Sequence, residues 1–532
     1  MAHEAARCAQ FIVHQLRTFC CTCDQISRRI EASHLTKELT HLTDRVSFLE
    51  EENRWLKSQL FGRSSEKRPQ DIAVEQQRLF NEAEGLAAHV VAESVTIAAH
   101  ERKKTSGSKK IPAGLPRVEV PHDIPEEEKF CPYDGARLER IGEETSEQFE
   151  FIPAKMQVLK HIRFKYGCPC CRQGVRIAPA PPHILPKSKA SPSLLAHIVT
   201  AKYVDALPLH RQEAQFARLG VDLPRTTMAS WMVKLGECVV PIINLLNDQL
   251  LESPLIQCDE TRVQVLSSDK TPTAEHWIWV RASGPPHRRI ILFDYDPSRA
   301  GAVPMRLLDG FTGILQTDGY EAYCAVAQAK QLIHAGCYAH ARRKFEDARK
   351  AQADPARDGQ SKIALDLIGQ LYRIEREIKA ASAEERLRVR QSQSAPVVRD
   401  LKVWLDKMAD AVLPQSALGK AVLYMLGQWR KLLPFLEHPQ IPLDTNRVEN
   451  AIRPFVIGRR NWLFSQSTAG ATASARLYSL VETARANGIE PHAYLSRLFA
   501  ELPKAASADH FESLLPWNIA LALPRAQCSS PN

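Results

Sequence analysis

The sequence of 532 residues has no apolar run of the roughly 20 residues that a membrane-spanning helix needs. It also lacks, at its N-terminus, the basic segment, apolar segment and small-residue cleavage site of a signal peptide. These absences predict a cytoplasmic protein without a membrane partner. In a reducing compartment the 13 cysteines are expected to be metal ligands or free thiols before disulfides.

Acidic residues are outnumbered. The chain has 61 Asp and Glu against 70 Lys and Arg, a formal net charge of +9. Such a surplus favours a polyanionic partner such as nucleic acid, although ribosome-associated and membrane-surface proteins share it. The hydrophobic fraction of 44% is ordinary for a globular protein. Since the length exceeds what one compact core needs, we expect several modules.

A heptad repeat marks the first module, residues 33–62, after an unassigned segment of residues 1–32. Apolar residues fill both seams of the repeat: Leu35, Leu39, Leu42, Val46, Leu49, Leu56 and Leu60. Asn53 takes one seam position, and a polar residue there fixes register and dimer state in coiled coils. The pattern predicts a leucine-zipper-like coiled coil and self-association as a dimer or higher oligomer. An amphipathic helix packed on its own chain is the alternative.

Residues 63–121 lose this periodicity and become polar, which predicts a flexible linker. Its basic stretch at residues 102–110 is either a solvated charge run or a tether that contacts phosphates.

Two clusters of candidate metal ligands lie in the next segment, residues 122–177. Cys168 and Cys171 have the spacing of one zinc-ligand pair, and Cys131 with Asp134 would supply the other. Cys170 is an alternative ligand, and reduced cysteines in a small β unit without metal are the alternative to a site. We favour a zinc-finger-like module with structural Zn²⁺.

Residues 178–252 read as a helical block with the outline of a helix-turn-helix. A helix at residues 211–219 is followed by a glycine turn and by a second helix that begins near Pro224. The start of the second helix would contact DNA through Arg225, Thr226 and Thr227. Helical hairpins that do not bind DNA share this outline.

The segment 253–480 changes to strands separated by turn residues. Three strands are expected at residues 254–266, 276–281 and 288–294, then a helix at 301–308, a strand at 313–318, a helix at 320–327, a strand at 331–336 and a helix at 339–350. Three antiparallel strands followed by alternating helix and strand is the order of an RNase H-like fold. The whole chain is therefore predicted to be a multidomain α/β protein.

Acidic residues on this segment predict a catalytic site. Asp259 lies within the first strand and Asp318 at the end of the fourth. Neighbouring carboxylates repel one another unless a cation neutralises them, so the pair suggests two Mg²⁺ ions, with Mn²⁺ as a substitute. Glu449, on a helix beyond a helical insertion at about residues 346–443, would complete the ligand set. A surface helix with ordinary ion pairs is the alternative for Glu449.

Basic residues near these acids are further candidates for contacts with DNA phosphates. They are Arg342, Arg343, Lys344, Arg447, Arg453, Arg459 and Arg460.

Seven stretches together carry a family resemblance: residues 60–67, 146–150, 259–262, 317–323, 336–345, 444–454 and 514–518. On these motifs the chain resembles the insertion sequence 66 transposases, the TnpC-type proteins of bacterial mobile elements. The C-terminal segment 481–532 contains the last stretch, and residues 519–532 match nothing.

The resemblance implies a DDE transposase whose triad is Asp259, Asp318 and Glu449 in an RNase H-like core. It implies binding to the element's terminal inverted repeats and to target double-stranded DNA, nucleoid association and accessory proteins of the same element. Cys337 and His340 match a Cys-x-x-His element with a structural or DNA-positioning role. A nuclease that does not join strands and a DNA-binding protein without activity are the rival functions.

Overall fold

The computed structural model describes residues 42–43, 45–46, 48–54, 56, 137, 156–166, 176–269, 271, 274–352 and 359–519. The chain divides into two compact units, residues 86–178 and the remainder. Each unit is described by itself. The predicted linker at residues 63–121 lies outside the described residues.

The smaller unit contains a short antiparallel pair of strands. β1 (Lys165–Tyr166) pairs with β2 (Arg176–Ile177), with Lys165 opposite Ile177. This pairing brackets the segment that carries Cys168 and Cys171. All four zinc candidates, Cys131, Asp134, Cys168 and Cys171, lie outside the described residues, so the ligand set stays a prediction.

The described part of the predicted coiled coil, between residues 42 and 56, is helical. Its seam side chains are exposed: Leu42, Val46, Leu49 and Leu56. An apolar seam facing solvent is what a coiled-coil strand has before it meets a partner. Self-association nevertheless stays a prediction.

Four helices form the block that precedes the sheet: α3 (Pro192–Tyr203), α4 (Leu209–Arg218), α5 (Arg225–Cys238) and α6 (Val240–Leu251). Gly220 lies between α4 and α5 with a φ of 78°, where a residue with a Cβ would be strained. The predicted helix, glycine turn and second helix are thus present. No single described helix is long and apolar enough to span a membrane, although α5 and α6, bent by 49°, pass that test as a pair.

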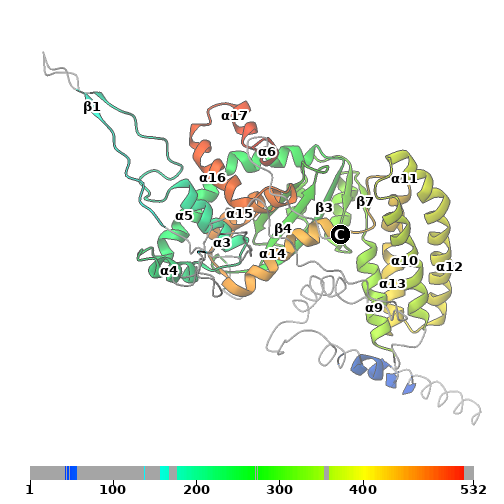
Figure 1. The fold of residues 1–532 in the computed structure, drawn as a ribbon. Coiled ribbons are helices and arrows are strands. Elements are labelled where there is room, and N and C mark those ends of the chain that lie inside the picture. Colours follow the sequence, from blue (N-terminus) through cyan, green and yellow to red (C-terminus); the bar gives the residue numbers. More distant parts are fainter. Residues whose placement is uncertain are drawn as a thin grey trace, which may run out of the picture. The chain divides into compact units, whose positions relative to one another are not determined.

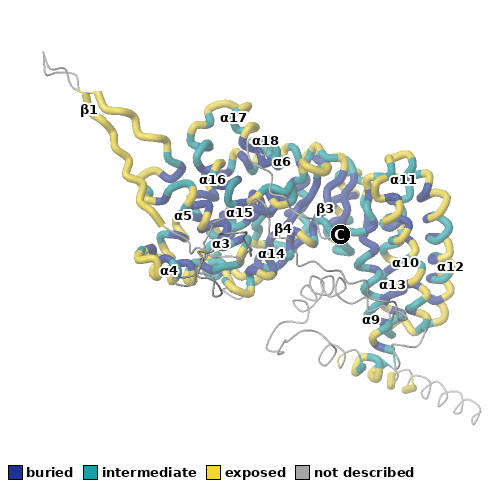
Figure 2. Tube along the Cα trace, in the orientation of Figure 1, coloured by how far each residue is buried: buried dark blue, intermediate teal, exposed yellow. Residues whose placement is uncertain are grey.

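The larger unit, which also contains α3 to α6, is organised around a mixed sheet. Its strands are β3 (Leu255–Ser267), β4 (Glu275–Ser283), β5 (Ile290–Asp296), β6 (Ile314–Gln316) and β7 (Ile333–Ala335), with β8 (Ser465–Ser467) pairing β3. The strand order is β5-β4-β3-β6-β7; the first three are antiparallel, and β6 and β7 join in parallel. The predicted strands and their order are confirmed. Strands β3 and β4 run through the buried interior in Figure 2.

Helices α7 (Ala302–Leu307), α8 (Glu321–Ala329) and α9 (Tyr338–Lys350) alternate with the later strands as predicted. Helices α10 (Gln360–Glu377), α11 (Ala383–Val389), α12 (Ala395–Ala411) and α13 (Ala417–Leu432) follow in the stretch expected to be a helical insertion (Figure 1). Helices α9, α10, α12 and α13 share a hydrophobic core distinct from that of β4 and β5. This second core also includes Leu255, Ile314 and Ala335, so the insertion packs against β3, β6 and β7.

The C-terminal helices pack on the sheet and on the helical block that precedes it. They are α14 (Asn446–Trp462), α15 (Thr468–Ala486), α16 (Pro491–Glu501), α17 (Ala508–Ser513) and α18 (Pro516–Ile519). On α15 the hydroxyls of Ser479 and Thr483 accept hydrogen bonds from the backbone N–H groups of Phe293 and Ile291 on edge strand β5. Unpaired strand edges invite aggregation, and α15 covers this one.

The predicted end of the catalytic domain, residue 480, lies within α15. Helix α15 runs through that position to Ala486, and its second half supplies Thr483 to β5. The apolar periodicity of the sequence did not by itself predict that α15 covers the edge strand β5.

Replacing Gly236 by Ala is expected to destabilise the fold, because a Cβ there would lie 2.7 Å from the Cα of Ala473 where α5 crosses α15. Overpacking of this kind costs about 1–3 kcal/mol. Gly427→Ala on α13 is the matched control, since its Cβ would meet nothing within 4 Å. The control should gain roughly 1 kcal/mol from helix propensity. Urea denaturation measures the free energy of unfolding of both variants. Equal values would contradict the close packing of α5 against α15.

Candidate active site

Three carboxylates predicted from the sequence come together from distant elements. Asp259 lies within β3, Asp318 follows the end of β6, and Glu449 is in the first turn of α14. The Asp318 carboxylate accepts a 2.9 Å hydrogen bond from the backbone N–H of Tyr320, which fixes its direction. The positive end of the α14 dipole favours the negative charge of Glu449.

The charges of both Asp318 and Glu449 act on Asp259. Burial raises the pKa of Asp259 well above its usual value, and the charges of Glu260, Asp318 and Glu449 raise it further, while His340 opposes the rise. A carboxyl whose ionisation is opposed by several neighbouring carboxylates needs a compensating cation to hold its charge at neutral pH.

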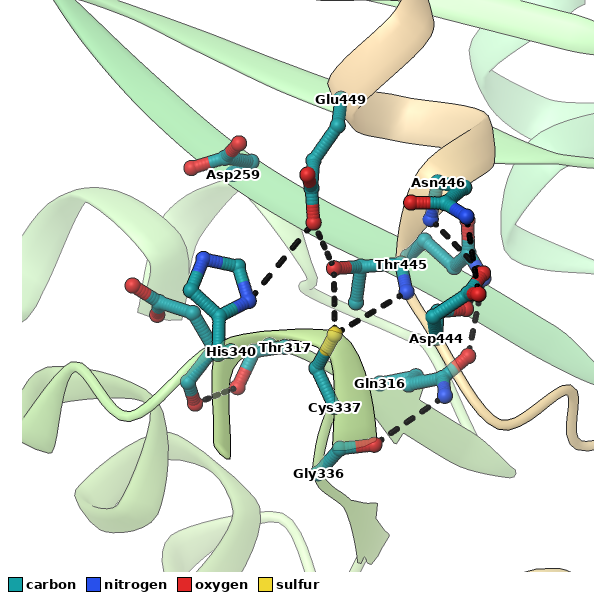
Figure 3. A network of polar contacts seen from close by, with 12 residues as sticks. Asp259, Gln316, Thr317, Gly336, Cys337, His340, Asp444, Thr445, Asn446 and Glu449 are labelled. Atoms are coloured by element: carbon teal, nitrogen blue, oxygen red, sulfur yellow. Dashed lines mark hydrogen bonds and ion pairs between the residues drawn. The ribbon is translucent and has the colours of Figure 1, made fainter. Parts of the chain in front are cut away.

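Glu449 is oriented by groups on its own helix and on α9. Its Oε1 accepts a 2.6 Å hydrogen bond from the Thr445 hydroxyl and lies 3.6 Å from Nδ1 of His340. The Thr445 hydroxyl also lies 3.3 Å from the Cys337 sulfur, and its N–H points to the same sulfur at 3.4 Å. Figure 3 shows Glu449 reaching from α14 toward Thr445 and His340, with Asp259 beside it.

His340 thus contacts Glu449 directly, and Cys337 contacts it through Thr445. Burial lowers the pKa of His340, but Cys337, Glu449 and Asp318 outweigh that effect and leave it well above the usual value. The position of the His340 ring, 3.6 Å from Glu449, supports the positioning role that resemblance suggested. The sequence analysis did not identify Thr445, although a threonine just before a helix is a recognisable capping residue.

Two buried glutamines, which the sequence analysis also did not single out, tie the start of α14 to the sheet. The Gln257 amide donates to the Gln316 side chain at 2.8 Å and to the Asp444 carbonyl at 3.1 Å. The Gln316 amide donates to the carbonyls of Pro442 and Gly336. These bonds hold the chain just before Glu449 against the strands that carry the two aspartates.

Glu260, the acid next to Asp259, is engaged on the opposite face. Its Oε1 accepts from Arg299 at 2.7 Å and its Oε2 from the Tyr323 hydroxyl of α8 at 2.7 Å. Its side chain is 2% exposed. Strand alternation directs Glu260 and Asp259 to opposite faces of β3, although the charge of Asp318 still raises the pKa of Glu260.

The basic candidates differ in their surroundings. Arg225 and Thr226 are exposed at the start of α5 and Thr227 is half-buried. Arg460 is exposed, whereas Arg459 donates to the Thr261 hydroxyl and to the carbonyl of Arg262 on β3. Arg459 is therefore anchored to the sheet.

The remaining basic candidates are partly exposed. Arg342 pairs with Glu346 on the same helix at 2.9 Å, and Lys344 lies 5.5 Å from the Tyr424 ring. Arg447 donates to the carbonyl of Gly284, and both Arg343 and Arg453 are half-buried. Burial lowers the pKa of Arg343, and the charge of Glu449 partly opposes this effect.

The three carboxylates offer the oxygen donors that a hard divalent cation takes, although their oxygens do not all lie within 4.8 Å of one another. Carboxylate oxygens are the ligands that Mg²⁺ and Mn²⁺ take, and the mutual repulsion at Asp259 is what such an ion relieves. Ligand atoms of Cys337, His340 and Glu449 also lie within 4.8 Å of one another. Glu449 therefore belongs both to the set of three carboxylates and to the cluster with Cys337 and His340.

Stability should depend on pH and metal through Asp259. Its pKa is raised on folding, so without metal its stabilising contribution is present at low pH and is lost as pH rises through the raised pKa. Asp259→Asn should then raise the melting temperature in EDTA at neutral pH by roughly 5 °C, and Mg²⁺ should stabilise the wild type but not the variant. Thermal denaturation at several pH values measures this.

Asp400→Asn, at an exposed position of α12, is the control for loss of one negative charge. If Asp259→Asn and Asp400→Asn respond alike to EDTA and pH, Asp259 does not sit in a repulsive cluster.

Comparison with known proteins decides the family. The sequence profile described as "Transposase IS66 family" matches residues 187–473, which include all three carboxylates. The chain belongs to the IS66 transposase family. Similar proteins occur in Sinorhizobium fredii: the uncharacterized protein y4jD is 34% identical over 420 residues, covering 77% of this chain and 81% of that protein. The uncharacterized protein y4hP is 34% identical over 402 residues, covering 72% of each chain.

Three further IS66 profiles match outside this region. A zinc-finger binding domain of transposase IS66 covers residues 128–172, with all four zinc candidates, and an IS66 C-terminal element covers residues 479–517. A profile described as "Transposase C of IS166 homeodomain" covers residues 48–120. It spans nearly all of the predicted linker. Family membership supports a transposase function, and the homeodomain-like region implies DNA as a partner.

Proposed function

We propose that this IS66 family member is a DDE transposase that cuts DNA at the ends of its element and joins them to a target. The observation that carries the proposal is the convergence of Asp259, Asp318 and Glu449 on one site, where two of them raise the pKa of the third. The strand order β5-β4-β3-β6-β7 supports an RNase H-like core, interrupted by the helices α10 to α13.

Asp259, Asp318 and Glu449 would hold Mg²⁺ or Mn²⁺. Two such ions supply activation of the attacking oxygen and stabilisation of the leaving oxygen in phosphodiester displacement. The protein's own part is to orient the acids: Tyr320 N–H holds Asp318, and Thr445 with His340 holds Glu449. Arg343 and Arg447 add positive charge for the phosphates.

DNA recognition is proposed for the exposed start of α5 and for the homeodomain-like region. The N-terminal helix, with its exposed apolar seam, would join two or more copies of the chain. Structural Zn²⁺ bound by Cys131, Asp134, Cys168 and Cys171 would stabilise the zinc-finger domain. A transposase acting on bacterial chromosomal DNA works in the cytoplasm, with accessory proteins of its element as further partners.

Strand joining tests the proposal directly. A labelled duplex that carries the element's terminal repeat with a free 3′-hydroxyl is incubated with plasmid, in Mg²⁺ or EDTA. Joined product that requires metal supports a transposase, and cleavage without joining supports a nuclease instead. If folded, DNA-binding protein does neither, even with the element's other proteins, it is a binding protein without activity.

A further inference from the structure

The chain makes a strained turn directly after α14. Leu463 has φ 61° and ψ −53°, which non-glycine residues rarely adopt. The N–H of Phe464 donates to the carbonyl of Trp462 at 2.8 Å, so Leu463 is the centre of a γ-turn with positive φ. Such a conformation costs about 1–3 kcal/mol and persists only where the surrounding structure imposes it.

The turn presents apolar side chains to solvent. Leu463 is 62% exposed and Phe464 39% exposed, and Ile457, one helical turn and a half earlier, is 46% exposed. At helical spacing, Arg453, Ile457 and Arg460 follow one another along one stripe of α14, and Leu463 and Phe464 come directly after the end of the helix at Trp462. This stripe alternates positive and apolar groups, unlike the face of α14 that packs on the sheet.

Positive charge surrounds the turn. Burial and the neighbouring Arg460 and Arg262 lower the pKa of Arg459 to about 10. Lys202 of α3 lies 5.2 Å from the Trp462 ring, and burial lowers its pKa to about 8. The exposed Arg460 and the half-buried Arg453, next to exposed apolar groups, favour a polyanion that also offers flat apolar surfaces.

The stripe starts at the active site. Glu449 is in the first turn of α14, and the 13 residues from it to Trp462, where the helix ends, correspond to about 20 Å at 1.5 Å per residue. Along B-form DNA, with about 3.4 Å per base pair, this is roughly six base pairs.

We infer that Leu463 and Phe464 form a wedge that inserts between base pairs of duplex DNA lying along α14, with its reactive phosphate at the triad. Apolar side chains inserted between base steps unstack them and kink the duplex. Arg453 and Arg460 would contact phosphates on either side of Ile457. This inference rests on the proposed DNA-processing function. Binding of a second copy of the chain, or of another protein, would not account for Arg453 and Arg460 along the stripe.

Unstacking can be measured with the full-length protein. A series of synthetic duplexes carries the fluorescent base 2-aminopurine at successive positions from one end, and a second series carries it within uninterrupted duplex. Wild type should raise the fluorescence at one step, about six base pairs from the reactive end. The two series tell whether the wedge acts on the element end or on target DNA.

The double variant Leu463→Gly, Phe464→Ala should abolish this signal and weaken binding about tenfold, with an unchanged salt dependence. Glycine relieves the positive φ, so its thermal stability should be equal to or above that of wild type. Arg460→Ala should instead reduce the slope of log affinity against log salt concentration by the amount of about one phosphate contact. The fluorescence maximum should stay at the same base step.

Val403→Ala is the matched control, because Val403 is 70% exposed on α12, away from this stripe. It should bind and unstack DNA like wild type. Wild type that binds DNA without local unstacking, or a double variant with full fluorescence, overturns the wedge while leaving the transposase proposal intact. Wild type that binds no DNA overturns both.

Discussion

Glu449→Gln is expected to lower strand joining by at least about a thousandfold while leaving duplex binding unchanged. Glutamine keeps the size of the side chain and its acceptor for Thr445, but it removes the negative charge that a divalent cation requires. Asp259→Asn and Asp318→Asn should have the same effect for the same reason. Joining is measured with a pre-cut terminal duplex and plasmid, and binding with a gel-shift assay.

Glu377→Gln is the matched control, since Glu377 is exposed on α10 and should retain full joining. Raising the Mg²⁺ concentration, or replacing Mg²⁺ by Mn²⁺, should recover part of the activity of a ligand variant but not of a misfolded one. Normal strand joining by the Glu449→Gln variant would show that another residue is the third acid. Loss of duplex binding by all three folded variants would show that these acids support DNA contact instead.

Arg299→Met is expected to destabilise the protein by about 2–4 kcal/mol, because it leaves the buried Glu260 carboxylate without its cation. The value is below that of a fully buried pair, since Arg299 is 38% exposed. Arg299 also stacks on the rings of Trp277 and Tyr320, at 4.6 and 4.1 Å. Tyr320 holds Asp318, so the Mg²⁺ requirement for joining should rise as well.

The double variant Arg299→Met, Glu260→Gln should regain most of the lost stability, because the unpaired charge is gone. Burial and Asp318 raise the pKa of Glu260, while Tyr323 and Arg299 oppose the rise. Without Arg299, Glu260 takes up a proton more readily on folding, so the defect of the single variant should grow as pH rises. Thermal denaturation across pH measures this. A double variant as unstable as Arg299→Met would assign the effect to lost ring stacking.

The strands of the sheet were predictable because their information is local. Residues 255–267 and 290–296 are rich in β-branched and aromatic residues between turn-forming segments. Asp259 and Asp318 stood out because acids are unusual in or at the end of such strands. Glu449 could be named only through its order after these two acids and through family resemblance.

The groups that complete the site could not be predicted in this way. Arg299 meets Glu260, and Gln257 meets Asp444, across separations of 39 and 187 residues. No local pattern records which buried polar group satisfies which other one, because many pairings have similar propensity.

The sequence by itself determined the element order, the candidate acids and the family, since each depends on residue types and spacing along the chain. Only the tertiary structure showed that α15 covers the edge of β5 and that Glu260 is neutralised on the far face. It alone showed that α14 ends in a strained apolar turn. These features depend on contacts between distant segments, where packing and electrostatics, rather than local preference, choose the conformation.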